Sequence, residues 1–264
     1  MRRPLASISR WQKVALTLVA VVVVWELAVR AAGLPAYVLP APTTVFRDFS
    51  GQWARVLSHS LVTAEIVLVG YVLGVLVSMP LALAIAFSPT VQATLYPLLV
   101  LFQIIPKIAV APLFIVWFGF GFLPKIMLVF LLSFFPIVIS AIAGFRSLDQ
   151  DVTDLARSTG AGAWKMFVKI RLPQSLPSIF TGLKVGAALA PTAAVVAEFV
   201  GSDKGLGYLI LEFNGFIEIP LVFACIVLLS AIGLALYYAV EMLEQLTIPW
   251  HVSQQGDETQ LGAT

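Results

Sequence analysis

Six long apolar runs constrain this chain more than any other feature of its sequence. A helix needs about 20 mostly apolar residues to cross a hydrocarbon core about 30 Å thick. The runs lack the alternating pattern of barrel strands, and a spanning segment must satisfy its own backbone, so helices are the only choice left. We therefore expect an all-α integral membrane protein with about six transmembrane helices, at residues 14–32, 61–87, 91–118, 124–145, 175–200 and 220–243.

The composition agrees with a protein that lives in a lipid bilayer. Hydrophobic residues make up 60% of the 264 positions and charged residues 11%, against about 25% charged in a soluble domain. A net charge of +2 is too small to argue for a nucleic-acid partner. The single cysteine, Cys225, excludes an intrachain disulfide and offers no metal-ligand spacing.

The amino terminus resembles a secretory signal, because a basic start precedes an apolar stretch. No clean cleavage site follows, and more spans lie downstream, so we expect a retained first helix. Positive charge collects in short cytoplasmic loops. The four basic residues before the first span therefore place the amino terminus inside, and six crossings return the carboxyl terminus to the same side. The arginines in the first outer connection make this bias moderate.

A proline-rich outer connection divides the chain. Pro35, Pro40 and Pro42 favour an extended stretch before a short amphipathic helix that begins near Thr43 or Thr44. We expect three parts: residues 1–57 with the cytoplasmic amino terminus, an accessory first helix and an outer linker, residues 58–245 with the transmembrane core, and residues 246–264 as a cytoplasmic tail.

The connection at residues 147–173 is the most polar interruption of the core. Its lysines and arginines place it on the same side as the amino terminus. Asp149, Asp151 and Asp154 crowd its start, where carboxylates complement the positive end of a helix. Gly160 stands where a left-handed helix stop is expected. The pattern predicts a short helix that ends near Gly160.

A second short helix is expected after this glycine. Trp164, Phe167 and Val168 share one face at i, i+3 and i+4 spacing, and Pro173 is expected to end the helix. One interpretation is an amphipathic pair that lies on lipid headgroups, with Trp164 as an interfacial anchor. The other is a surface on which a separate protein acts.

The spacing of this loop resembles a known signature. The residues that fit the pattern E-A-A, three residues, G, nine residues, I-x-L-P are Asp154, Ala156, Gly160, Ile170, Leu172 and Pro173. This pattern resembles the signature loop of permease subunits of ATP-binding-cassette (ABC) importers. Asp154 replaces the usual glutamate, and Leu155 replaces the first alanine. "APLFIVWFGFG" at residues 111–121 and "GLGYLI" at 205–210 resemble the branch that imports nitrate, sulfonates such as taurine, and pyrimidine precursors of thiamine.

The resemblance implies a type I importer fold in a bacterial inner membrane, with five core helices and an accessory first helix. It also implies two permease subunits in a homodimer, two cytoplasmic ATPases that use ATP and Mg²⁺, and an external binding protein that delivers a small polar, anionic or heterocyclic solute. The residues of the loop expected to couple the spans to the ATPase are Asp154, Ala156, Gly160, Trp164, Phe167, Ile170, Leu172 and Pro173.

The chain itself carries no motif for catalysis. "GAGAWK" and "GSDKGLG" lack the G-x-x-x-x-G-K-[ST] spacing that cradles a phosphate, and neither G-x-S-x-G nor H-E-x-x-H is present. We expect no enzyme activity and no bound cofactor or metal. A secondary transporter driven by an ion gradient is the alternative, but such proteins often show repeats and intramembrane carboxylates. A membrane-embedded enzyme would need a titratable cluster, and we identify none.

Two ionisable residues are candidates for the translocation pathway. Lys107 lies between Pro106 and Pro112, where prolines free backbone groups that only a protein-lined or wet environment tolerates. We expect a broken helix there, with Lys107 either attracting an anion or snorkelling to an interface. Glu198 lies near the outer end of its span, directly before the glycine-rich segment 201–207, and is either a pathway residue or a paired structural one.

Overall fold

The computed structural model describes residues 10–148, 150–158 and 162–250, and within these ranges the chain is helical with no β-strand. In chain order the helical segments are α1 (Arg10–Ala31), α2 (Pro42–Phe87), α3 (Pro89–Ile104), the 3-10 turn η1 (Lys107–Val110), α4 (Ala111–Phe118), α5 (Phe122–Arg146), α6 (Gln150–Ser158), α7 (Ala163–Met166), the π-helical turn η2 (Phe167–Arg171), α8 (Leu172–Gly201), α9 (Leu206–Gly215) and α10 (Ile219–Thr247).

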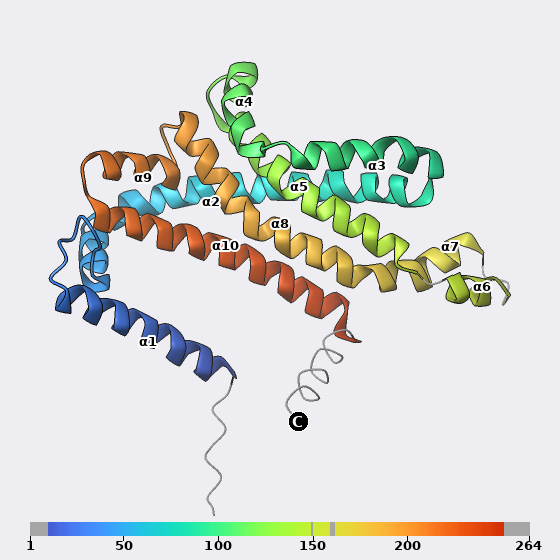
Figure 1. Cartoon of the computed structure of the whole chain (residues 1–264), viewed down its shortest axis with the longest axis horizontal. Coiled ribbons are helices and arrows are strands. Elements are labelled where there is room, and N and C mark those ends of the chain that lie inside the picture. The colour runs from blue at the N-terminus through green and yellow to red at the C-terminus, as the bar shows by residue number, and fades with distance from the viewer. Residues whose placement is uncertain (1–9, 149, 159–161, 251–264) are drawn as a thin grey trace, which may run out of the picture.

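The long helices α2, α5, α8 and α10 form an elongated bundle (Figure 1). The short helices α6 and α7 lie at one end of the bundle, and α9 lies at the other. The start of α1 and the end of α10 both point toward the end that carries α6 and α7. Helix α4 projects from the side of the bundle, and α3 lies along it. The polar loop and the glycine-rich segment are therefore at opposite ends of the same bundle.

Four described helices are long and apolar enough to cross a membrane, or five if the bent pair α3 and α4 counts as one span. Three predicted spans lie within α2, α5 and α10. The fifth predicted span begins earlier than expected, because the helix is continuous from Ala163 to Gly201. The first predicted span corresponds to α1, so a total of six crossings stays a prediction. The predicted boundary between residues 57 and 58 falls inside α2, after an irregular residue at Gln52, and the three-part division also stays a prediction.

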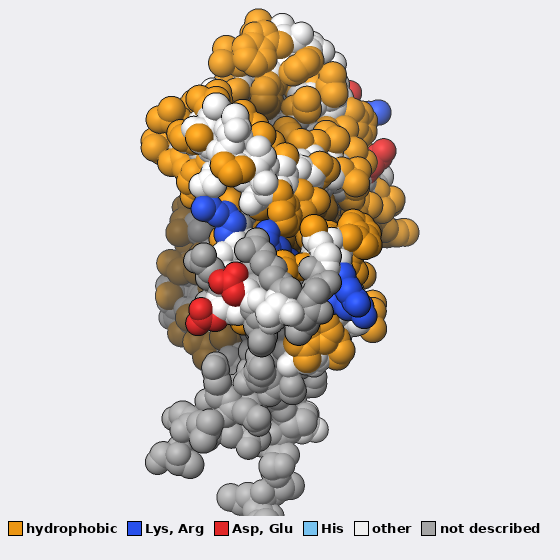
Figure 2. Space-filling view, turned by 90° about the vertical axis from the view of Figure 1, so that its right-hand side faces the viewer, with side chains coloured by type: hydrophobic (Ala, Val, Ile, Leu, Met, Phe, Trp, Pro, Cys, Tyr) orange, Lys and Arg blue, Asp and Glu red, His pale blue; other side chains and the backbone are white. Residues whose placement is uncertain are grey.

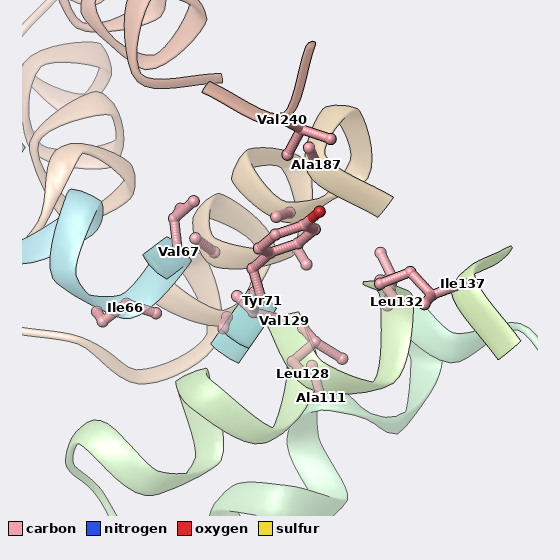
Figure 3. Close-up of a cluster of buried hydrophobic side chains, with 14 of the residues drawn as sticks. Ile66, Val67, Tyr71, Ala111, Leu128, Val129, Leu132, Ile137, Ala187 and Val240 are labelled. Carbon is pink, nitrogen blue, oxygen red and sulfur yellow. The ribbon is translucent and has the colours of Figure 1, made fainter. Parts of the chain in front are cut away.

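Glycines allow α5 to pack closely against both of its neighbours. A Cβ atom added at Gly182 of α8 would lie 2.5 Å from Cβ of Ser140, and one at Gly70 of α2 would lie 2.5 Å from Cβ of Val129. Small residues at helix interfaces are how membrane helices gain dispersion contacts without a hydrophobic driving force. Tyr71 from α2 points into the resulting core, with its ring among side chains of α5 and α8 (Figure 3). The three helices therefore form one tightly packed unit.

Helix α9 is held at its start by side chains from α2 and α8. The first backbone amides of a helix have no partner within it. The amide of Gly205 donates to Nδ1 of His59 at 3.1 Å, and the amide of Leu206 donates to the hydroxyl of Thr63 at 2.8 Å. The amide of Gly207 donates to Oε2 of Glu198 at 2.6 Å, and the Thr63 hydroxyl donates to Oε1 at 2.8 Å. We call this set of interactions the α9 clip.

The two glycines of the clip make room for the carboxylate. A Cβ atom at Gly205, whose φ is +107°, would lie 2.2 Å from Oε1 of Glu198. One at Gly207 would lie 2.7 Å from Cβ of the same residue. Glu198 is 1% exposed. Its Oε2 accepts from the amide of Gly207 in the first turn of α9, so the carboxyl group satisfies a backbone amide that has no partner within the helix.

The α9 clip predicts a specific loss of stability. Glu198→Ala leaves buried donors without an acceptor, which costs about 2 kcal/mol and lowers the Tm of the purified chain by about 5 °C. Glu218→Ala, at an exposed carboxylate that makes no capping bond, is the matched control and is expected to leave Tm unchanged. An unchanged Tm in Glu198→Ala would contradict the capping role.

Candidate functional site

The predicted coupling residues lie at the end of the bundle that carries α6 and α7. Figure 2 looks at this end, where acidic and basic side chains gather and the rest of the face is mainly hydrophobic. Asp154 is exposed in α6, whereas Ala156 is 8% exposed. Trp164 of α7 is 77% exposed. Gly160 lies outside the described residues. An amphipathic α6 and a projecting tryptophan therefore form a surface at the tip of the bundle.

The expected helix end at Pro173 is wrong. Helix α7 passes through the π-turn η2 directly into α8, and Arg171 and Leu172 keep helical dihedral angles. Proline normally breaks a helix because its ring clashes with the carbonyl four residues earlier and its N–H is missing. A π-turn uses longer i to i+5 hydrogen bonds, and it directly precedes Pro173. The wider turn changes which backbone groups face the proline ring, so the helix continues through Pro173.

Phe167 joins the coupling surface to two further spans. Its ring lies 5.5 Å from that of Phe87, at the end of α2, and 6.4 Å from that of Phe145, at the end of α5. The guanidinium of Arg171 lies 5.0 Å above the Phe87 ring. Trp164 lies 6.1 Å from Phe167 and continues the cluster toward the exposed tip. We call Phe87, Phe145, Phe167 and Arg171 the aromatic joint.

The remaining signature residues lie at the junction of η2 and α8. Ile170 and Leu172 are partly buried, and both Leu172 and Phe167 pack against an apolar core formed mainly by α5, with residues of α2, α3 and α8. Displacement of the tip is therefore opposed by packing against the spans rather than absorbed by a flexible linker.

The predicted break around Lys107 is confirmed. Helix α3 ends at Ile104, and the segment that follows is bent by 86°. Pro106 precedes η1, and Pro112 lies in the first turn of α4, where a missing N–H costs no hydrogen bond. Nζ of Lys107 donates to the carbonyl of Gln103 at 2.8 Å and lies 4.7 Å from the ring centre of Phe135. The lysine thus caps the last turn of α3 while its side chain stays partly exposed.

At the other end of the bundle, the structure pairs charged groups that the sequence did not single out as site residues. Nζ of Lys125, which is 4% exposed, donates to the hydroxyl of Ser202 at 2.5 Å. Arg55 donates to both carboxylate oxygens of Glu212, at 2.6 and 2.7 Å, and this hydrogen bonding holds the pKa of Glu212 below its usual value. The sequence did offer a signal for Lys125, because a lysine that directly follows the first proline of a span is an ionisable residue at the end of an apolar helix.

A cavity of about 310 Å³ lies between α8 and α10 in the middle of the bundle. Three hydroxyl-bearing residues, Thr192, Ser230 and Tyr237, line it beside Pro191 and Gly233. One helical turn away from Ala188 on its rim, Lys184 forms an ion pair with Glu244 of α10. Spaced single hydroxyls in apolar helices give no recognisable sequence pattern, so sequence reasoning missed this cavity.

Comparison with known proteins gives a consistent answer. Residues 70–248 match the family described as binding-protein-dependent transport system inner membrane component. The chain is 35% identical to the formylaminopyrimidine transport permease ThiX of Halalkalibacterium halodurans over 88% of this chain and 93% of that one. It is 30% identical to the taurine transport permease TauC of Escherichia coli over 82% and 79%. A solved chain of the MetNI methionine ABC transporter, in an inward-facing form, superposes with a TM-score of 0.61 at 16% identity, over 75% of this chain and 98% of that chain.

These findings agree with the helical bundle, whereas the roles of the loop residues stay predictions. They favour the ABC importer over the ion-gradient transporter that the sequence left as an alternative. Members of this family work in the inner membrane as multi-pass transport subunits, together with an ATPase and a binding protein. The chain belongs to the binding-protein-dependent transport system inner membrane component family and is a permease subunit of an ABC importer.

Proposed function

We propose that this permease subunit pairs with a second copy of itself and moves a small solute that carries an anionic group or a nitrogen heterocycle. The observation that carries the proposal is the unbroken helix from Ala163 to Gly201. It connects an exposed surface, on which a partner ATPase acts, to the α9 clip at the opposite end. An external binding protein delivers the solute at the clip end. ATP and Mg²⁺ bind to the ATPase, and this chain binds neither.

The basic residues around α6 and α7 support a cytoplasmic position for that end. The start of α1 and the end of α10 point the same way (Figure 1), so both termini are then cytoplasmic. The residues proposed to receive the ATPase are those of the signature, from Asp154 and Ala156 through Gly160 to Trp164. Those proposed to transmit its movement are Phe167, Ile170, Leu172 and Pro173.

The α3–α4 arm supports the proposal of a second permease copy. Val116, Trp117 and Phe120 are 78%, 62% and 80% exposed, and α4 projects from its own bundle (Figure 1). An arm of this kind gains its packing contacts from another subunit, and closed two-fold pairing is the commonest way in which identical chains associate. The arm also carries Lys107, Pro106 and Pro112, so the proposed pathway runs beside the contact between the two copies.

The solute class rests on the relatives and on Lys107. One relative is named for taurine, a sulfonate, and another for a formylaminopyrimidine. Lys107 uses one described hydrogen bond and one ring contact, and an ammonium group has three donors, so donors remain to hold an anion. Glu198 is proposed to act on the pathway through the position of α9, since its carboxylate is buried in the clip.

The coupling proposal predicts that substitutions of two neighbouring aromatic residues have different effects on ATPase binding and on transport. Trp164→Ala removes an exposed side chain, so it is expected to reduce co-purification of the ATPase while insertion and Tm stay unchanged. Phe167→Leu keeps the exposed tip but loosens the aromatic joint, where each ring pair contributes about 1 kcal/mol. This variant is expected to bind the ATPase normally and hydrolyse ATP with reduced transport per ATP.

The control for the coupling experiment is Trp53→Ala, at an exposed tryptophan of α2 that is far from α7 in the sequence and has no proposed role. It is expected to leave co-purification of the ATPase unchanged. Normal transport per ATP in Phe167→Leu would contradict the aromatic joint as a transmitting element, and normal ATPase binding in Trp164→Ala would contradict the docking surface.

The proposed role of Lys107 predicts that a positive charge at this position favours uptake of a solute with an anionic group. In vesicles that contain the complete importer, Lys107→Met is expected to reduce uptake of radiolabelled taurine about tenfold, since a hydrogen bond to a charged group contributes about 1.5 kcal/mol. Lys107→Arg keeps the charge and is expected to retain most of the uptake. Equal uptake by all three proteins would show that Lys107 only caps α3.

The same vesicles separate ATP-driven import from ion-driven transport. Uptake is expected to stop when the ATPase is omitted and to continue when an uncoupler collapses the proton gradient. Uptake by the permease alone would contradict the proposed function, whichever solute is used.

A further inference from the structure

An apolar cavity of about 320 Å³ lies between α1, the first turns of α2 and α10, away from the coupling surface and from the proposed pathway. All nine residues that line it are apolar or aromatic. Val22 and Trp25 come from α1, Phe46 and Phe49 from α2, and Val227 from α10. An apolar space of this kind does not hold ordered water, which needs several polar partners.

A second cavity, of about 490 Å³, adjoins the first at the corner between α1 and α2. Pro42 and Val45 line the apolar cavity, whereas Thr43 and Thr44 line the second one. Arg30 also lines the second cavity, and its side chain is 66% exposed. Together the two cavities have an apolar part and a polar mouth.

The polar mouth holds an organised pair of opposite charges. Nε of Arg30 donates to Oε1 of Glu26 at 2.5 Å. Glu26 is positioned by α2, because both the amide and the hydroxyl of Thr43 donate to it, at 3.1 and 2.9 Å. Nη2 of Arg30 also donates to the Thr43 hydroxyl at 3.4 Å. Nη1 makes no hydrogen bond among the described residues, so this part of the exposed guanidinium remains available to an anion.

Trp25 lies between the polar mouth and the apolar part. Its ring packs against Phe223 of α10, with ring centres 5.7 Å apart. Its indole Nε1 is shielded from solvent and has no acceptor among the described residues. Buried tryptophan N–H groups usually have a partner. The missing acceptor is an independent sign that a ligand with an oxygen belongs in this place.

The charged Arg30, the indole of Trp25 and the apolar Val22 follow one another along the axis of α1. With a rise of 1.5 Å per residue, Trp25 lies about 7.5 Å and Val22 about 12 Å from the level of Arg30. A phosphate, then an ester carbonyl, then an acyl chain is the order in which a glycerophospholipid descends into a membrane. The large side chains of α1 that do not line the cavity, such as Val24 at 65% exposed, are apolar as well, so this helix is suited to lipid on its other sides.

We propose that the two cavities form one binding site for a glycerophospholipid. An acyl chain enters the apolar cavity, an ester carbonyl accepts from Trp25, and the phosphate binds Arg30. A second apolar protein helix fits less well, since it supplies no anion for Arg30. The bound lipid thus lies between the accessory helix α1 and α10 and contacts both.

The test compares two tryptophan substitutions on the same helix. Val22→Trp fills the apolar cavity, whereas Val24→Trp adds the same side chain at an exposed position that does not line it. The full chain is purified in detergent with phosphatidylethanolamine and bound lipids are counted by native mass spectrometry. We expect one retained phospholipid per chain in the unchanged protein and in Val24→Trp, and at least about tenfold weaker retention in Val22→Trp.

Two further variants test the contacts with the headgroup and with the ester, at residues that line the polar mouth and the apolar cavity. Arg30→Gln is expected to weaken phosphatidylethanolamine binding about fivefold but to leave binding of diacylglycerol, which has no phosphate, unchanged. Trp25→Phe keeps the ring and removes the N–H, and it is expected to weaken binding of both lipids. Inorganic phosphate alone is expected not to compete.

Three results would overturn the proposal. Equal retention in Val22→Trp and Val24→Trp would mean that the lipid is only part of the general annulus. Competition by free phosphate would mean that Arg30 holds a small anion. Loss of a dimer in Val22→Trp, with lipid retention unchanged, would mean that the cavity belongs to a contact between two copies.

Discussion

The close approach of α5 to α2 and α8 is the contact on which the rest of the structure depends. Glycines at Gly70 and Gly182 bring the helix backbones together, and any Cβ atom there would overlap the facing helix. Lipid supplies no hydrophobic force between helices, so this packing and a few hydrogen bonds, such as Tyr71 to the carbonyl of Leu183, hold the unit together. Because the unit is rigid, movement at one end of α8 is transmitted to the other end.

Helix α8 links two sites with different chemistry. Its N-terminal end continues into α7 through the π-turn η2 and meets the aromatic joint around Phe167. Its C-terminal end carries Glu198, which caps α9 together with Thr63 of α2. The first contact is made of aromatic rings, whereas the second is made of short, directional hydrogen bonds. A push at the N-terminal end is therefore expected to move the C-terminal end as a unit with α9.

The sequence predicted the features that depend on local composition and missed those that depend on tertiary contacts. Apolar runs predicted α2, α5 and α10, and two prolines predicted the break at Lys107. The end expected at Pro173 was wrong because no sequence rule announces a π-turn. The clip was not foreseen because Thr63 and Glu198 meet only after folding, and an isolated threonine in an apolar helix carries no signal. The role of Gly160 stays a prediction.

The central claim is that α7, η2 and α8 move as one rod. Cysteines introduced at Lys165 and Val185, after replacement of the native Cys225, place two spin labels 20 residues apart, or about 30 Å on a continuous helix. Their distance distribution is measured by pulsed electron paramagnetic resonance in the complete importer, with and without ATP. The account predicts the same narrow distribution near 30 Å in both states. A distribution that broadens or shifts by several ångströms with ATP would show that the π-turn is a hinge, and would contradict the account.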